Sequence, residues 1–346
     1  MRKELSYENR LVIEIMYNKG FKVKEIAAEL GVNPSTIYRE LPRGRYQHKN
    51  SDWTYTEKYS AEKAQLAHNF NVLARGKPLK VGNDHDFVKY VSAMIRKKKY
   101  SPQAIVADVE KNHFQFQTTV SYKTIYRYVE AGLIPNVTRK DLPFRGVRKK
   151  KRKAKPIIPV AENKRSIELR PVEIGDRSAF GHWEMDSVIG KREKGQTLIV
   201  MTERKTRFEL VFRSKDKTIA STVRILNRLE KRLGRNFKTI FRSITVDNGS
   251  EFNSSGLIER SIYRGIRTVL YYCHPYQSSE RGSNEKQNQM LRRYIIKHTR
   301  IEEYSDRDLR DVQEWINNYP RGIFNYRSAS DLFHEELDKL GVVVNL

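Results

Sequence analysis

Near the N-terminus, the segment KVKEIAAELGVNPSTIYRE spaces its apolar residues as two short helices would. Ile26 and Leu30 are four residues apart and therefore share one helix face. Gly31 predicts the end of that helix, because glycine readily adopts the left-handed backbone found there. Asn33 and Pro34 then predict the N-cap and the first residue of a second helix. This order of helix, glycine turn and helix is the helix-turn-helix layout.

We place this helix-turn-helix DNA-binding domain at residues 1–45, with a supporting helix over 6–18. The apolar Ile37 is predicted to point back to the first helix of the pair. An ordinary helical hairpin is the alternative. The residues expected to contact DNA are Ser35, Thr36, Tyr38 and Arg39.

The tetrapeptide TIYR occurs again at 124–127, in similar surroundings. Ser101 and Pro102 predict the start of one helix, and Ser121 predicts the N-cap of another. We therefore expect a second helix-turn-helix-like domain over 82–135, with a structural helical subdomain or a dimerisation element as the alternative. The residues expected to contact DNA here are Ser121, Lys123, Thr124, Tyr126 and Arg127.

Two segments join these domains to each other and to the second half of the chain. Residues 46–81 are predicted to form a helical connector, and 136–172 a linker that contains the basic run RKKKRKAKP. Because like charges repel, this run is expected to be extended and to lie on DNA phosphates. It also looks like a nuclear-localisation sequence, but nothing else in the sequence supports a eukaryotic host. The phosphate-binding residues expected here are Arg148, Lys149, Lys150, Lys151, Arg152 and Lys153.

The second half of the chain has a different pattern. GHWEMDSVIG, QTLIVMTER and FELVFRS are rich in apolar and β-branched residues, and they predict three consecutive antiparallel strands. An amphipathic helix comes next, then a strand, a short helix, a strand and another helix. This order predicts an α/β ribonuclease-H-like domain with a mixed five-stranded sheet over 173–335, with a C-terminal tail over 336–346. The whole chain is thus expected to be multidomain, with all-α modules before the α/β domain.

Composition narrows the range of functions. The 67 Lys and Arg residues exceed the 41 Asp and Glu residues, which gives a net charge of +26 and favours a nucleic-acid partner. The single cysteine, Cys273, excludes a disulfide within the chain and makes a cysteine-based zinc site very unfavourable. Because no signal segment or apolar span is apparent, we expect no membrane contact and a cytoplasmic, nucleoid-associated prokaryotic protein.

Three acidic positions lie where a ribonuclease-H-like fold gathers them. Asp186 is within the first strand of the domain, Asp247 ends the fourth, and Glu280 or Glu285 lies near the start of the helix after the fifth. Because the first and fourth strands of this fold are neighbours, their carboxylates can meet. Such a cluster suits Mg²⁺, and two ions roughly 3.5–4 Å apart can promote displacement at phosphorus. The alternative for each acid is a solvated turn residue.

Together, GHWEMDSVIG, MTERKTRF, TVDNGSEF, ERGSNEKQNQMLRRYIIK and NNYPRGIFNY resemble transposases of the insertion-sequence-30 family, within the DDE transposase and retroviral-integrase superfamily. The resemblance implies an enzyme that uses Mg²⁺, or Mn²⁺ in its place, to cut double-stranded DNA at terminal inverted repeats. It also implies joining of the freed 3′-hydroxyl to target DNA, by a homodimer or a larger assembly. The motif positions imply Asp186, Asp247 and Glu285 as catalytic metal ligands, with Asn288 following. Met185 departs from the glycine usual in the family.

Helix placement also favours Glu285 over Glu280. Ser283 or Asn284 is expected to cap the helix and so to place Glu285 in its first turn, on the same face as Asn288 and Arg292. Glu280 replaces part of the family's usual P-W-Q and is expected to pair with a nearby arginine. Arg281 and Arg292 are further candidates for binding DNA.

Glu184 is left with two alternatives. It is two residues from Asp186, so both side chains point to the same side of a strand. It either supports the metal site or binds a basic neighbour such as Lys205. For the whole protein, the rivals to a transposase are a catalytically inactive, transposase-derived DNA-binding regulator and a nuclease that cuts without joining.

Overall fold

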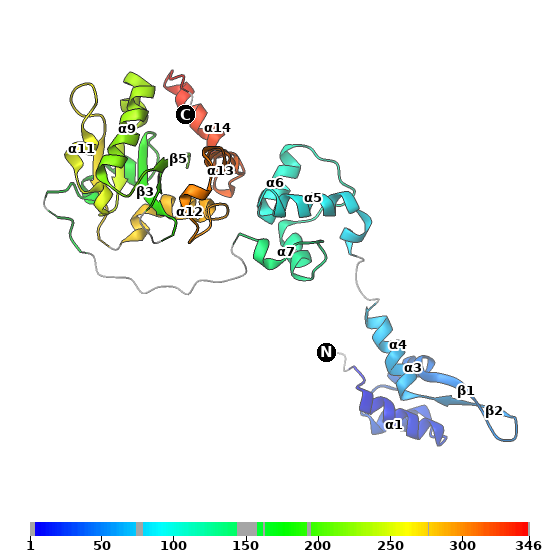
Figure 1. Cartoon of the computed structure of the whole chain (residues 1–346). Coiled ribbons are helices and arrows are strands. Elements are labelled where there is room, and N and C mark those ends of the chain that lie inside the picture. The colour runs from blue at the N-terminus through cyan, green and yellow to red at the C-terminus, as the bar shows by residue number, and fades with distance from the viewer. Residues whose placement is uncertain are drawn as a thin grey trace. The chain divides into compact units, whose positions relative to one another are not determined.

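The computed structural model describes residues 4–73, 79–143, 158–161, 163–191, 195–275 and 277–344. The basic run from Arg148 to Lys153, which we expect to bind phosphates, lies outside the described residues. The chain divides into two compact units, Met1–Leu79 and Lys80–Leu346 (Figure 1).

The first unit contains the predicted helix-turn-helix. The Ser6 side chain caps its first helix and the Asn33 side chain caps its third, while Ile26 and Ile37 are fully buried in one core, as predicted. Arg10 and Glu40 form a buried ion pair of 2.7 Å beside this core. The elements are α1 (Tyr7–Asn18), α2 (Val23–Glu29), α3 (Pro34–Gly44), β1 (Arg45–Lys49), β2 (Tyr55–Tyr59) and α4 (Ala61–Leu73).

The connector expected over 46–81 is only partly helical. Its first part is an antiparallel hairpin of β1 and β2, and only α4 is a helix. The strands RYQHK and YTEKY are polar and short, so they lack the apolar alternation that predicts a strand, although tyrosine and threonine favour one. Tyr59, Ala61 and Ala64 are fully buried in the core that contains Ile37. This segment is therefore part of the DNA-binding unit.

The second unit begins with a three-helix module: α5 (His85–Arg96), α6 (Pro102–Lys111) and α7 (Tyr122–Glu130). Ser101 and Ser121 cap α6 and α7 through their side chains, as the sequence predicts. The first helix of the module, α5, buries Phe87, Val91 and Ile95 along one face.

The α/β domain contains the predicted five-stranded mixed sheet, in the order β5-β4-β3-β6-β7. Strands β3, β4 and β5 are antiparallel, whereas β6 and β7 run parallel to β3, which confirms the ribonuclease-H-like prediction. The strands are β3 (His182–Ile189), β4 (Thr197–Glu203), β5 (Glu209–Ser214), β6 (Ser243–Val246) and β7 (Val269–Tyr272). The helices are α8 (Val172–Gly175), α9 (Ile219–Leu233), α10 (Phe237–Ile240), α11 (Ser255–Glu259), α12 (Gly282–Leu291), α13 (Asp306–Asn318) and α14 (Ala329–Lys339).

Short 3₁₀ turns connect many of these elements. Two border the candidate site, Ser250–Phe252 after β6 and Ser278–Arg281 before α12. The others are Lys80–Asn83, Arg139–Asp141, Ile167–Leu169, Gly234–Asn236, Ile301–Glu303 and Gly322–Phe324.

Alternating residues of the sheet pack on opposite sides. Trp183 and Met185 of β3 lie in the core that contains α9, whereas Val188 lies in the core that contains α12 and α13. Glu184 and Asp186 alternate with Trp183 and Met185, so they face the α12 side. The sheet thus separates α9 from these two acids.

Residues 336–344 do not form a separate tail. Leu337 and Val342 are buried in the core of the sheet together with Phe333, so α14 completes the α/β domain. Within the described residues, no helix is both long enough and apolar enough to span a membrane.

Candidate active site

Asp186 and Asp247 come together because β3 and β6 are adjacent, parallel strands. One guanidinium joins them: Arg281 Nη1 is 3.1 Å from Asp186 Oδ1, and Arg281 Nη2 is 2.9 Å from Asp247 Oδ2. The backbone N–H of Gly249 donates to the other oxygen of Asp247. The two carboxylates from distant parts of the sequence therefore share one positive group.

Opposing effects act on the pKa of Asp186. Burial raises the pKa of Asp186 and the nearby Asp247 adds to this rise, whereas Arg281 acts to lower it. Burial alone would lower the pKa of Arg281, but the two aspartates outweigh burial and its pKa is raised. The site therefore favours a positive group between two carboxylates.

Helix α12 brings an amide to the same place. Asn288 Nδ2 donates to Asp186 Oδ2 over 2.8 Å. The other amide atom, Asn288 Oδ1, is buried and has no hydrogen-bond partner among the described residues. An acceptor oxygen without a donor thus lies beside Asp186.

Glu285 lies in the first turn of α12, as predicted, and its side chain is exposed. No described residue forms a hydrogen bond or ion pair with it. Across the described ranges, no three His, Cys, Asp or Glu side chains are grouped closely enough to hold one metal ion together. The structure thus brings Asp186, Asp247 and Asn288 together and leaves Glu285 one helical turn away from Asn288.

Glu184 follows the second alternative, since it binds a basic neighbour, but that neighbour is Arg204 rather than Lys205. It is fully buried, pairs with Arg204 and accepts the backbone N–H of Asn284 over 2.9 Å. Lys205, the basic neighbour considered from the sequence, binds Glu336 instead over 2.7 Å. Arg204 in turn donates to the carbonyl of Ile174. Glu184 therefore ties the start of α12 to strand β3.

The expected cap of α12 is wrong. Neither Ser283 nor Asn284 accepts a capping hydrogen bond, and the helix begins two or three residues earlier than such a cap would place it, at Gly282. Both side chains are used elsewhere: Ser283 Oγ accepts from Arg207, and Asn284 Oδ1 accepts from Thr202. A carboxylate from another strand satisfies the helix start, which local sequence spacing does not reveal.

The expected partner of Glu280 is also wrong. Its carboxylate lies 2.7 Å from His274 Nδ1 and accepts the backbone N–H of the same histidine over 2.8 Å. His274 Nε2 lies 3.3 Å from Glu168. Arg281 points to the aspartates, so Glu280 braces the approach loop through the histidine six residues before it.

Two buried acids near the site were not expected from the sequence. Glu251 accepts from Ser187 Oγ and lies 3.4 Å from Lys217 Nζ. Burial raises the pKa of Glu209 to about 8. Glu251 follows a glycine turn in DNGSEF, and Glu209 is the one charged residue in the apolar strand sequence FELVF. An acid in such a setting is a sequence signal that could have revealed each of them.

The candidate DNA-contacting residues lie on several surfaces. On α3, Ser35, Tyr38 and Arg39 are exposed and Thr36 is half-buried; on α7, Ser121, Lys123 and Arg127 are exposed. Thr124 and Tyr126 are half-buried, and burial raises the pKa of Tyr126. Arg292 is half-buried, and its Nη2 donates to the carbonyl of Ile189 over 2.7 Å.

The three-helix module contacts the helices beside the site. Trp315 Nε1 donates to the carbonyl of Lys98 over 2.7 Å, and the Tyr319 hydroxyl accepts from the backbone of Ser101 over 3.0 Å. Arg293, just after α12, donates to the carbonyl of Lys99 over 3.0 Å. The module is thus joined to α13 and to the end of α12 by bonds at three points.

Known proteins resemble the chain over most of its length. A family model described as a helix-turn-helix domain matches residues 1–44. A probable transposase for insertion-like sequence element IS1161 from Streptococcus salivarius is 33% identical over 347 residues, covering 96% of this chain and 94% of the relative. The transposase InsI for insertion sequence element IS30C from Escherichia coli (strain K12) is 26% identical, covering 95% and 82%.

Among solved structures, the catalytic core domain of BIV integrase matches with a TM-score of 0.35 and 16% identity, over 46% of this chain and 98% of that one.

Proposed function

Because the chain belongs to the insertion-sequence-30 family of transposases, we propose that it cuts the ends of its own mobile element at terminal inverted repeats and joins them to target DNA with the help of Mg²⁺. The chain is a DNA transposase of the polynucleotidyl transferase type. The proposal adds the metal, the residues that bind it and the DNA sequences that it acts on.

The observation that carries the metal proposal is the guanidinium of Arg281 between Asp186 and Asp247. A cation already satisfies these carboxylates, and oxygen donors are the ligands that Mg²⁺ prefers. The partnerless Asn288 Oδ1 beside them adds another oxygen that favours a positive group. These residues fit a divalent ion.

We assign Asp186, Asp247 and Glu285 to hold the metal, and Asn288 to orient Asp186. When bound, Mg²⁺, as one or two ions, would supply charge that activates an attacking oxygen and stabilises a leaving one at phosphorus. For Asp186 and Asp247 both to bind the metal, Arg281 would have to release its ion pair with at least one of them. Its guanidinium would then be available to hold a phosphate oxygen. The exposed side chain of Glu285, in the first turn of α12, would turn toward the aspartates to join them.

The DNA ends are assigned to the helix-turn-helix. Helix α3 presents the exposed polar Ser35, Tyr38 and Arg39, which suit contacts to base edges and phosphates in a major groove. Bringing two ends together requires at least two copies of the chain, so we propose a homodimer or a larger assembly on DNA.

Strand transfer on a labelled terminal-repeat duplex with Mg²⁺ tests this function. We expect the wild type to release a 3′-hydroxyl end and join it to a second duplex, and Asp186→Asn and Asp247→Asn each to lose both steps. Wild-type-like activity in both variants would overturn the metal assignment. Cleavage without joined products would indicate a nuclease, and binding without cleavage a regulator.

A further inference from the structure

The outward face of α9 and of the turn after it carries only positive charge, and the candidate site does not use it. At about 100° per residue, four cationic positions of α9 fall within an arc of about 100° around the helix axis, and a fifth follows in the 3₁₀ turn after it. All five side chains are exposed, whereas Leu226, Leu229 and Leu233 on the other side are buried. We call these five the α9 cationic face: Arg224, Arg228, Lys231, Arg232 and Arg235.

Nothing in the described part of the chain neutralises this face. None of its five side chains forms a hydrogen bond or ion pair with a described residue. The one acid of α9, Glu230, is 2% exposed and is bound to Arg267 over 3.3 Å. Like charges four residues apart cost a helix about 0.2–0.5 kcal/mol per pair. The free helix is therefore destabilised by its own outward charges, and a bound polyanion would reverse this cost.

A neighbouring helix shows what an ordinary solvated face looks like. The exposed positions of α13 alternate in sign from Asp306 through Arg307 and Asp308 to Arg310 and Asp311. Such mixed charge is typical of a helix that faces only water. The α9 cationic face lacks this alternation, so solubility alone explains it poorly.

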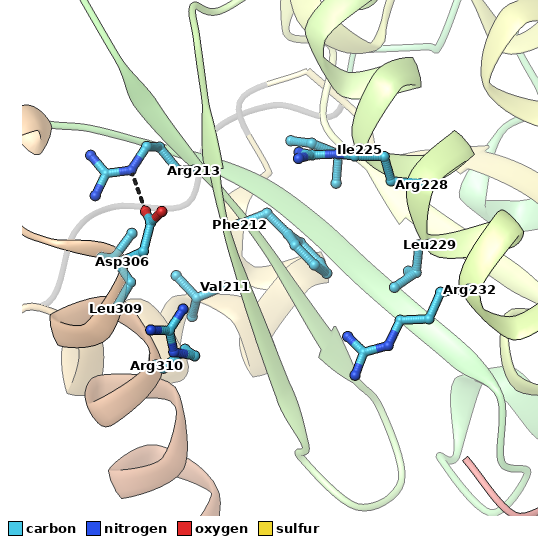
Figure 2. A pocket seen from close by; sticks show the side chains of 10 residues that line it. All are labelled: Val211, Phe212, Arg213, Ile225, Arg228, Leu229, Arg232, Asp306, Leu309 and Arg310. Carbon is cyan, nitrogen blue, oxygen red and sulfur yellow. Dashed lines mark hydrogen bonds and ion pairs between the residues drawn. The ribbon is translucent and has the colours of Figure 1, made fainter. Parts of the chain in front are cut away.

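A groove beside α9 extends the positive surface. It has a volume of about 350 Å³, is open to solvent, and lies over the edge strand β5 and between α9 and α13. Figure 2 shows Arg228 and Arg232 on the α9 side, Arg310 on the α13 side, and Phe212 between them. Arg213 at the rim is already paired with Asp306 over 2.9 Å. Cations without a described acidic partner thus line both walls of the groove.

This surface is separate from the candidate active site. Helix α9 packs against Trp183 and Met185 on one face of the sheet, whereas Asp186 and Asn288 lie on the other face. A phosphate held by the α9 cationic face is therefore not the phosphate that lies at Asp186.

We propose that the α9 cationic face binds the sugar-phosphate backbone of target DNA without reading its sequence. Arginine and lysine contacts to phosphates give affinity but carry no sequence information, which suits a DNA that is not the element's own end. Arg224 and Arg232 are about 12 Å apart along the helix axis, and duplex DNA carries one charge per about 1.7 Å, so several phosphates can be engaged at once. The identification of the DNA as target rests on the proposed function.

The test compares two full-length variants of equal charge. One carries Arg224→Gln, Arg228→Gln, Arg232→Gln and Arg235→Gln, since glutamine is a good helix former. The matched control carries Lys238→Gln, Arg260→Gln, Arg264→Gln and Arg307→Gln, at exposed positions elsewhere on the same domain. Binding is measured against salt on a duplex with the terminal repeat and on one without it, and end cleavage and joining are followed separately.

We expect the α9 variant to bind the repeat-free duplex at least ~10-fold more weakly, with a salt slope reduced by about 0.9 for each phosphate that the protein no longer neutralises. Binding and cleavage of repeat ends should stay within about threefold of the control, and joining should fall. The binding comparison needs no catalysis, so it remains decisive even if the proposed chemistry fails.

Three outcomes would overturn the proposal. Equal DNA binding by the α9 variant and the control would indicate that the face contacts only solvent. An equal loss on both duplexes would show that the face binds the element's ends as much as other DNA, and so does not serve target DNA in particular. A change in oligomeric state without DNA, measured by light scattering, would assign it to contact between copies of the chain.

Discussion

Glu184 and Asp186 lie two residues apart on the same face of β3, yet their surroundings differ sharply. Glu184 is fully buried, and Arg204 and the start of α12 each occupy one of its oxygens. Asp186 shares its guanidinium with Asp247, and its pKa is raised by burial. Among the described carboxylates Glu184 alone pairs with Arg204, whereas Asp186 and Asp247 divide one guanidinium between them, so a further cation is favoured beside these two. We therefore propose a structural role for Glu184 and keep the catalytic role of Asp186 as a prediction.

The largest expected effect concerns the third acid. Glu285→Gln should reduce strand cleavage by roughly 10²–10³-fold or more, the scale seen when one group that stabilises transition-state charge is removed. DNA binding, measured by gel shift, should stay unchanged because Glu285 is exposed and bonds to no described residue. The matched variant Glu280→Gln should keep activity within about threefold, since its acid braces a loop through His274. The reverse order of effects would assign the metal to Glu280.

The next effect separates Glu184 from Asp186 by stability. Glu184→Ala leaves Arg204 buried without its counter-charge, which should cost about 3–5 kcal/mol in the free energy of unfolding. Asp186→Asn should cost less than about 1 kcal/mol, because the carboxylate's charge is already disfavoured by burial. Urea unfolding measures both. Similar losses in the two variants would remove the distinction between the two acids.

A smaller effect is expected at the shared cation. Arg281→Gln leaves Asp186 and Asp247 facing each other without compensation, so the metal-free protein should lose about 1–3 kcal/mol of stability. Millimolar Mg²⁺ should restore much of this loss, and thermal unfolding with and without the ion measures it. If Mg²⁺ stabilised the variant no more than the wild type, the guanidinium and the ion would not share a site.

The smallest effect concerns pH and Glu209. Its folded pKa of about 8 lies above the ordinary value of 4.5, so this group's contribution to stability is full below the ordinary value and is lost as pH rises through about 8. Glu209→Gln, which imitates the protonated acid, should remove that dependence. At about pH 8 the variant should be more stable by at least ~1 kcal/mol, or about 2–4 °C in Tm. A wild-type and variant difference that does not grow between about pH 5 and pH 8 would contradict this.

The hydrogen bonds around Glu209 support this direction. Thr202 Oγ1 lies 2.5 Å from Glu209 Oε2 and 2.6 Å from Asn284 Oδ1, although a hydroxyl has only one proton to donate. A protonated Glu209 donates to Thr202 and leaves the hydroxyl proton for Asn284. Protonation therefore also supports the residue at the start of α12.

The sheet and its helices were predictable because their cores are apolar with regular spacing. The sequence pattern predicts the strands that carry Asp186 and Asp247, and in the ribonuclease-H-like fold these two strands are adjacent. The hairpin β1–β2 was missed because its strands are polar and bury only Tyr59, so they show no apolar alternation. The cap of α12 by Glu184 and the His274–Glu280 pair were missed because each depends on where a side chain lies across the folded site. The roles of the three metal-binding candidates stay predictions.

The bonds from Trp315, Tyr319 and Arg293 to the three-helix module have a mechanical consequence. They hold the three-helix module against α13 and the end of α12, so α7 and Asp186 belong to the same compact unit. A duplex bound by α7 would then place a phosphate at the carboxylates, at a set number of base pairs from α7. Inserting one base pair between the two would advance the DNA by about 3.4 Å and move the cut with it, rather than moving the protein.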